Sequence, residues 1–247
     1  MRIPTTATLA VPAALMLMFA AACDSKEDGA SVAAGSSGPS APSVPSANGV
    51  ERLDAAKILA RARKATLAAR SVRLHGTIRD DDGKDVTLDF RYSGGKAMGD
   101  LTTDGQRVSL VRIGRAVYFK GDDAFWKAAG GKGAVQLLSG KYLKTTPNEK
   151  DFAELAAFTI PSKLFAQLLT PEGALSKRGA ATVAGVPATS LADGGGGRLY
   201  VATRGEPHVL RIESKGDGRV DFDGYGAAVA IQPPPAGQVV DVADLNP

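Results

Sequence analysis

Apolar and polar residues alternate along much of this chain, most regularly over residues 85–92. One face of that stretch is apolar and the other is polar, with Val86, Leu88, Phe90 and Tyr92 opposed to Asp85, Thr87, Asp89 and Arg91. A period of two is typical of a half-buried β-strand. Residues 72–79 repeat the pattern, and the Asp-Gly pair between the two stretches predicts a β-hairpin.

Similar stretches continue the pattern on both sides of a non-alternating middle region. Turn residues at 104–105 and 114–115 separate the stretches 96–103, 106–113 and 115–120. This arrangement predicts an antiparallel meander with one buried face and one solvent-facing side. The other stretches predicted as strands are 96–103, 106–113, 115–120, 177–191, 197–203, 207–214, 218–226 and 228–232.

Helical periodicity appears in two places. Residues 50–70 lack glycine and proline, and small or apolar residues recur at helical spacing opposite Lys57, Arg61 and Lys64. This predicts an amphipathic helix, and its alanine-rich stripe favours packing on a sheet over lying on a membrane. Short helices are predicted over 122–129, 132–144, 151–158 and 161–170. Together these elements predict an α+β fold, in which one large curved antiparallel sheet packs over an N-terminal helix and short central helices.

The first residues have the layout of an export signal. Arg2 is the only charged residue before Cys23, positions 7–22 are apolar or small, and three alanines lead directly into the cysteine. The segment resembles a bacterial lipoprotein signal, which implies that residues 1–22 are removed and that the Cys23 sulfur carries a lipid. The alternatives are an uncleaved membrane anchor, a free thiol or an intermolecular disulfide. Acylation of the chain's only cysteine would leave none for disulfides.

The segment that follows Cys23 has almost no large apolar residues. Residues 24–49 consist mainly of Ser, Gly, Ala and Pro, so 23–49 is predicted to be a lipidated, disordered tether and 50–247 a single domain. The whole chain has a formal net charge of +4, and its basic residues alternate with acidic ones, unlike the basic patch of a nucleic-acid-binding protein. We therefore expect a domain anchored to the outer, extracytoplasmic face of the cell membrane, with no nucleic-acid partner.

Residues suited to catalysis are scarce. His75 and His208 stand alone within predicted strands, and neither a G-x-S-x-G nor an H-E-x-x-H motif occurs. The glycine-rich residues 193–198 lack the Lys-Ser/Thr pair of a phosphate-binding loop, so they are interpreted as a hairpin connection. Trp126, the only tryptophan, either covers a ligand entrance or anchors a loop to the core. We expect no enzyme activity, no cofactor and no metal site.

Three stretches resemble a known family, namely 114–126 (which ends in YFKGDDAFW), 184–191 (AGVPATSL) and 199–214 (LYVATRGEPHVLRIES). With the order of elements, they are similar to actinobacterial lipoproteins of the LppX–LprG type over roughly residues 50–235. The resemblance implies a half-barrel sheet like that of the LolA lipoprotein carrier, with an apolar cavity for acyl chains between sheet and helices. The family's cavity has no sequence signature, so no ligand-binding residues are assigned.

Two functions follow as hypotheses. The first is a carrier that binds a lipid or lipoglycan in such a cavity. The second is a non-catalytic envelope sensor, scaffold or protein-interaction module with a filled core. A contiguous apolar void of several hundred Å³ would favour the carrier, because ligand pockets are usually of that size.

Overall fold

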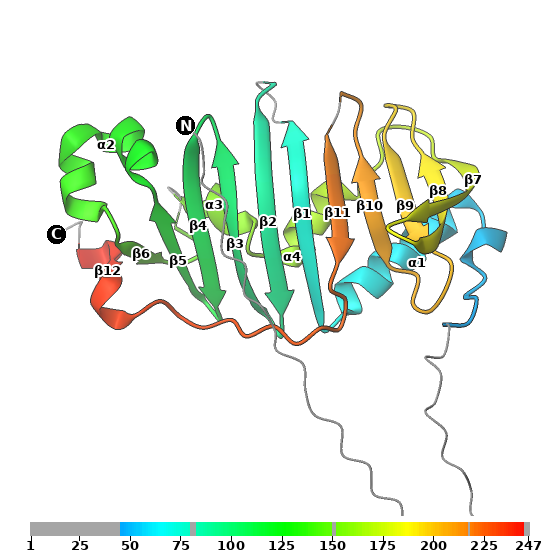
Figure 1. Ribbon diagram of the computed structural model, residues 1–247, viewed down its shortest axis with the longest axis horizontal. Coiled ribbons are helices and arrows are strands. Elements are labelled where there is room, and N and C mark those ends of the chain that lie inside the picture. Colours follow the sequence, from blue (N-terminus) through cyan, green and yellow to red (C-terminus); the bar gives the residue numbers. More distant parts are fainter. Residues whose placement is uncertain (1–44, 80–82, 150–151, 217, 245–247) are drawn as a thin grey trace, which may run out of the picture. The chain divides into compact units, whose positions relative to one another are not determined.

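The computed structural model describes residues 45–79, 83–149, 152–216 and 218–244, which belong to one compact unit (Figure 1). The predicted signal, Cys23 and residues 24–44 of the predicted tether lie outside the described residues. The unit is built on a large curved sheet that does not close on itself, with few helices, which confirms the predicted α+β fold class.

Twelve strands form this sheet within the described residues, in the spatial order β12-β6-β5-β4-β3-β2-β1-β11-β10-β9-β8-β7. Consecutive strands pair as hairpins on either side of the centre, and β1 lies between β2 and β11. The first six strands along the chain are β1 (Ser71–Arg79), β2 (Asp85–Ser93), β3 (Lys96–Thr103), β4 (Gln106–Ile113), β5 (Ala116–Gly121) and β6 (Tyr142–Thr145). The later strands are β7 (Ser176–Val183), β8 (Val186–Ala192), β9 (Arg198–Ala202), β10 (Val209–Glu213), β11 (Arg219–Asp223) and β12 (Val239–Asp241).

Three details of the structure differ from the prediction. The neighbouring strands are antiparallel except for β12, which pairs in parallel with β6, so the sheet is mixed. Residues 228–232 form no strand, because three prolines without amide hydrogens follow at 233–235 and the segment runs past the strand ends towards β12 (Figure 1). Within 132–144, the helix ends at Leu138, and Gly140 with a φ of 73° turns the chain into β6.

The helices are α1 (Ala55–Ala68), α2 (Asp123–Leu138), α3 (Ala153–Ala157) and α4 (Pro161–Leu168), with short 3₁₀ turns at η1 (Val50–Arg52), η3 (Ala236–Gln238) and η4 (Val242–Asp244). In α1, the Asp54 carboxylate caps the first turn by accepting a hydrogen bond from the Lys57 amide at 2.8 Å. Helices α1, α3 and α4 cover one face of the sheet, which we call the inner face (Figure 1). Among the described residues, no helix has both the length and the apolar character needed to cross a membrane.

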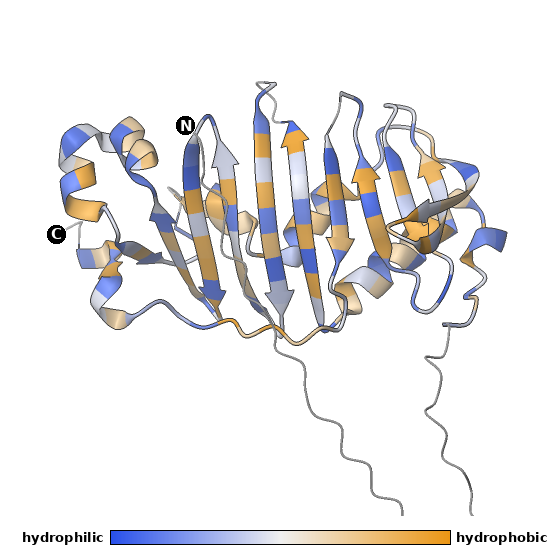
Figure 2. Ribbon diagram, viewed as in Figure 1, coloured by the Kyte–Doolittle hydropathy of each residue, from blue (hydrophilic) through white to orange (hydrophobic). Residues whose placement is uncertain are grey.

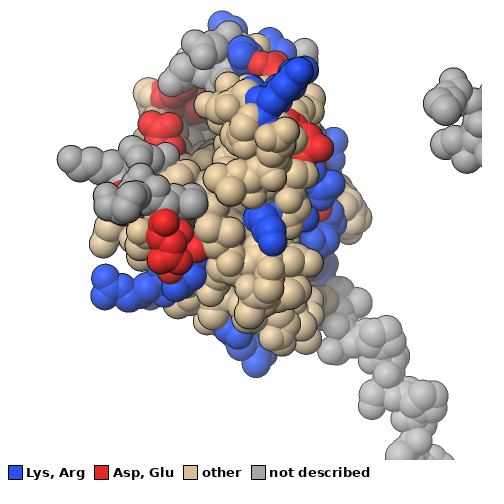
Figure 3. Space-filling view, turned by 90° about the vertical axis from the view of Figure 1, so that its left-hand side faces the viewer, with Lys and Arg blue, Asp and Glu red and all other residues tan. Residues whose placement is uncertain are grey.

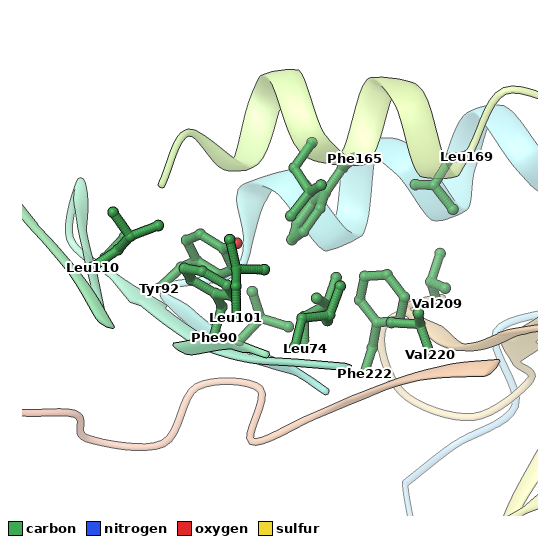
Figure 4. Packing of buried hydrophobic residues seen from close by; sticks show 14 of the residues in the cluster. Leu74, Phe90, Tyr92, Leu101, Leu110, Phe165, Leu169, Val209, Val220 and Phe222 are labelled. Carbon is green, nitrogen blue, oxygen red and sulfur yellow. The ribbon is translucent and has the colours of Figure 1, made fainter. Parts of the chain in front are cut away.

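The core lies between the inner face and these helices. Strand residues alternate in hydropathy (Figure 2), and on β2 the side chains of Leu88, Phe90 and Tyr92 are buried, as predicted. Phe165 of α4 contacts Tyr92 and Phe222 edge-on, with ring centroids 5.7 and 5.5 Å apart (Figure 4). The middle of the inner face is therefore filled with aromatic side chains.

The opposite, outer face carries the polar residues of the same strands. Arg73 of β1 donates two hydrogen bonds to the carboxylate of Asp89 on β2, at 2.8 and 2.7 Å. The His75 Nε2 atom lies 2.9 Å from the Asp223 carboxylate on β11. Cross-strand pairs of this kind stabilise a solvent-facing sheet surface. Further pairs on this face are Arg107–Asp100, Arg211–Asp221 and Arg219–Asp221.

Candidate functional site

A pocket of about 330 Å³ opens at the β7–β10 end of the inner face. It lies between the end of α4, the loop that follows it, the middle of α1 and strands β8 to β10. Seven of its eighteen lining residues are leucine or isoleucine, namely Leu59, Leu168, Leu169, Leu175, Leu191, Leu199 and Ile212. Such a surface excludes water and favours apolar groups.

The strand register produces the floor. Leu191 of β8 pairs with Leu199 of β9, and Leu199 pairs with Ile212 of β10, so three aliphatic side chains stand next to one another across three strands. Inward-pointing residues in register form such a row because side chains alternate between the two faces of a strand. The sequence pattern therefore fixes this part of the pocket.

In the wall formed by α1 and α4, a long-range contact joins the two helices. The Arg63 guanidinium on α1 donates a hydrogen bond to the Leu169 carbonyl and a second, at 3.3 Å, to the Thr170 hydroxyl. Those groups lie at the C-terminal end of α4, where backbone carbonyls have no partner within the helix. Leu59, one turn before Arg63 on α1, lines the same pocket. Arg63 thus holds the two helices at the spacing that leaves the pocket between them.

A polar rim surrounds the aliphatic surface. Asp193 organises it, because one carboxylate oxygen accepts a hydrogen bond from the Gly197 amide at 2.8 Å and the other accepts one from the Glu172 amide at 2.9 Å. Residues 193–198 connect β8 to β9, which confirms the predicted hairpin connection. Through Asp193 they also contact the loop that follows α4. Arg198 and Lys215 also line the rim, and no ion pair joins either to a carboxylate among the described residues.

A second pocket, of about 620 Å³, lies further along β7 to β9, beside the N-terminal segment. Its lining is small or polar, with Thr182, Thr189, Thr203 and Arg204 among its residues. The Lys177 ammonium, which also lines it, donates to the Glu51 carbonyl at 2.8 Å. The lining of this second pocket contains no leucine, isoleucine or aromatic residue, so the smaller pocket, which offers leucine and isoleucine side chains, is the better candidate for an aliphatic chain.

The segment beside this second pocket was predicted to be the end of the tether. Asn48 Nδ2 donates to the Ala202 and Gly205 carbonyls, both at 3.0 Å, and Ala47 pairs with Arg204 in an isolated β-bridge. Ordered contacts therefore begin a few residues before position 50.

No protein-family model and no curated protein matches the chain. Among solved structures, the chain is similar to LprF from Mycobacterium bovis, with 17% identity, a TM-score of 0.47, and coverage of 78% of this chain and 99% of that one. LprF is of the LppX–LprG type, the type that the sequence resembles.

Two further solved structures are similar. An uncharacterized conserved protein from Thermus thermophilus matches with 13% identity and a TM-score of 0.37, over 76% of this chain and 98% of that one. A chain of the MucA/MucB complex from Pseudomonas aeruginosa matches with 20% identity and a TM-score of 0.37, over 71% of this chain and 58% of that one.

The two histidines and Trp126, which the sequence singled out, lie apart from one another and do not line the aliphatic pocket, whereas the glycine-rich residues 193–198 form part of its rim. His75 is on the outer face of β1, and His208, just before β10, stacks on Tyr225. Trp126 is buried, with its ring centroid 5.6 Å from that of Phe119 on β5, so it anchors α2 to the sheet and is not a lid. No cluster of three or more potential metal ligands occurs in the part of the chain that the structure describes.

Proposed function

We propose that this protein binds the apolar part of an amphiphile in the pocket between α1, α4 and strands β8 to β10. The observation that carries the proposal is the aliphatic surface of this pocket, whose volume of about 330 Å³ lies at the lower end of the range typical of ligand sites. Each methylene group that leaves water for such a surface contributes about 0.8 kcal/mol to binding.

The rim gives the proposed ligand its amphiphilic character. Apolar side chains form the inner surface, whereas Gln167, Arg198, Ser214 and Lys215 stand where the pocket meets solvent. A molecule with an apolar chain could bury that chain against the leucines, and a polar head would reach these solvent-facing groups, whereas a wholly polar molecule would gain nothing from the leucines. The fitting ligand has an apolar chain and a polar head.

The proposal extends to the place where the protein works. Export followed by acylation of Cys23 would hold the domain at the outer face of the cell membrane, next to a source of acyl chains. The support for this part is the sequence layout around Cys23, and the role is binding or carrying without catalysis.

One observation favours the alternative of an interaction module. Phe165 and its aromatic neighbours fill the middle of the inner face, so the pocket occupies only one end of the sheet (Figure 4). A small pocket suits a single apolar chain better than a large lipoglycan. Under the alternative, the pocket would stay empty in protein taken from the cell.

Native mass spectrometry of protein purified from its own host, followed by organic extraction, distinguishes the two functions. We expect a bound amphiphile, and its loss from an Ile212→Trp variant in which the indole fills the half-buried wall of the pocket. A Leu67→Trp variant is the matched control, because Leu67 is on α1 but is 47% exposed and lines no part of the pocket. Wild-type protein without any extractable amphiphile would contradict the proposal.

A further inference from the structure

Residues 170–175, here called the bridging loop, lie between α4 and β7 and form one wall of the ligand pocket. The first of them is fixed to α1 by the hydrogen bond from Arg63 described above. At the far side, the Glu172 amide donates to the Asp193 carboxylate at 2.9 Å, and the Glu172 carbonyl accepts from the Gly195 amide at 3.0 Å. The loop therefore joins the helical side of the pocket to the turn between β8 and β9.

This turn, residues 193–197, is shaped for the contact. One Asp193 carboxylate oxygen accepts from the Gly197 amide at 2.8 Å while the other accepts from the Glu172 amide, so a single side chain fastens the turn and the loop together. A β-carbon at Gly195 would lie 2.3 Å from a Glu172 carboxylate oxygen, and one at Gly197 would lie 3.1 Å from the Asp193 carboxylate. The glycines thus allow a close approach of turn and loop that larger residues would prevent.

The bridging loop is the least firmly held wall of the pocket. Glu172, Gly173 and Ala174 are exposed, whereas Leu191 and Leu199 on the pocket floor are buried in the sheet. Surface segments that are held mainly by hydrogen bonds open at a lower free energy than buried strands. Of the elements around the pocket, this loop is therefore the one that can move while the sheet and helices stay in place.

We propose that the bridging loop moves aside to widen the mouth of the pocket when a ligand enters or leaves, and that Asp193 controls the rate by holding the loop in place. The inference rests on the proposed function, because it concerns the same pocket. Opening breaks the two hydrogen bonds of Glu172 with Asp193 and Gly195. The hydrogen bond from Arg63 keeps the start of the loop attached to α1. Asp193 is thus a positioning residue, which acts on the ligand through the loop.

A reversible cross-link tests this role. In a chain that carries Glu172→Cys and Gly195→Cys, the two β-carbons start 2.8 Å apart, and a disulfide needs about 3.8 Å, so a small outward shift allows the bond to form. The pair is made in full-length Cys23→Ala protein, because Cys23 is the only cysteine of the chain. The probe is dansylaminoundecanoic acid, and dansyl fluorescence follows its binding and its release into excess unlabelled lauric acid.

The cross-link should change rates and leave affinity almost unaltered. We expect the oxidised pair to bind and release the probe about tenfold more slowly than the reduced pair, with equilibrium affinities within about twofold of each other. Reduction should restore both rates. Equal rates before and after reduction would overturn the proposal, and a pair that does not oxidise would contradict the close approach on which it depends.

Asp193→Ala is the second test, and Asp122→Ala is its matched control. The Asp122 carboxylate also binds two backbone amides, those of Phe125 at 2.7 Å and Arg107 at 3.0 Å, but it lines no part of the pocket. It lies where α2 begins, at the end of the molecule that faces the viewer in Figure 3, where acidic as well as basic side chains surround uncharged residues. Asp193→Ala should accelerate release of the probe about tenfold, whereas Asp122→Ala should leave it unchanged. Equal release from the two variants would overturn the proposal.

Failure of the proposed function gives a different result. A Cys23→Ala protein that binds neither the probe nor any amphiphile from its host would overturn both the function and the role of the loop. A protein that binds the probe, but whose rates respond neither to the cross-link nor to Asp193→Ala, would overturn the role of the loop alone.

Discussion

The imidazole ring of His208 lies flat against the phenol ring of Tyr225, with centroids 3.9 Å apart and planes within 4° of parallel. The Tyr225 hydroxyl donates a hydrogen bond to the Val209 carbonyl at 2.5 Å, which joins the segment after β11 to the start of β10. Burial lowers the pKa of His208 and raises the pKa of Tyr225, because both rings lose water that would solvate their charged forms.

His208 should make the stability of the protein depend on pH. Since its pKa is lower in the folded chain than in the unfolded one, the unfolded chain binds more protons below about pH 6.5. The free energy of unfolding should therefore fall as the pH drops from about 7 to about 5. Urea denaturation across this range should show a shallower decrease for His208→Phe, which keeps a stacked ring but cannot titrate. Parallel curves for the two proteins would contradict this account.

Asp89 should contribute stability at the acidic end of the range. The hydrogen bonds from Arg73 are the main reason that its pKa lies below the ordinary value, and burial opposes them. Its contribution is present above about pH 4 and is lost as the pH falls through the lowered pKa. Because the pair is partly solvated, we expect Asp89→Asn to lower the free energy of unfolding at pH 7 by about 1 kcal/mol or less. The difference between the variant and wild type should vanish in strong acid.

Gly76 allows β1 and β11 to approach each other at the centre of the sheet. A β-carbon at this position would lie 2.0 Å from the Arg219 carbonyl oxygen, and the φ of Gly76 is 148°. Gly76→Ala should destabilise the protein by about 2 kcal/mol or more. Gly133→Ala is the matched control, because nothing lies within 4 Å of the added carbon in α2, and it should be neutral or stabilising by up to about 1 kcal/mol. Thermal unfolding of the two variants would give the comparison.

Phe165 links α4 to the centre of the sheet and is 1% exposed. Phe165→Ala should reduce the free energy of unfolding by about 3–5 kcal/mol, through lost burial and the cavity left between Tyr92 and Phe222. Leu67→Ala, on the solvent side of α1, should change it by no more than about 0.5 kcal/mol. Similar losses for both variants would show that the aromatic packing described above does not dominate the core.

Cys23 should determine whether the protein stays at the membrane. If its sulfur carries the lipid, Cys23→Ala should release an exported domain into the medium, whereas wild-type protein should remain with membranes after salt and carbonate washing. Intact-mass measurement should find a mature chain that begins at acylated Cys23. A Cys23→Ala protein that resists the same washing would indicate an uncleaved anchor instead.

The strands of this protein were largely predictable because each buries one face only. In β2, apolar and polar residues alternate without interruption, and the hairpin with β1 follows from the turn residues between them. Alternation wrongly predicted a strand at 228–232, because these residues have no neighbouring strand with which to form hydrogen bonds. The residue pattern predicted a helix where β6 lies, because this strand is only four residues long and forms through its pairing with β5.

The pocket was not predictable to the same degree. Leu191, Leu199 and Ile212 occupy apolar positions in predicted strands, so a sequence pattern could have found them once the strand order was known. Nothing local indicates that Arg63 binds the end of α4, because that contact spans 106 residues.

The position of β1 between β2 and β11 has a consequence for how the chain reaches its native state. The hairpins of β1 to β5 and of β7 to β11 can each form from neighbouring segments, but the pairing of β1 with β11 brings together residues such as His75 and Asp223, which are 148 positions apart. Closure over such a span is slow, since loop entropy is lost before the contacts form. Until Asp223 has been synthesised, the edge of β1 that faces β11 has no strand to pair with, so a chaperone that shields strand edges should raise the yield of folded protein.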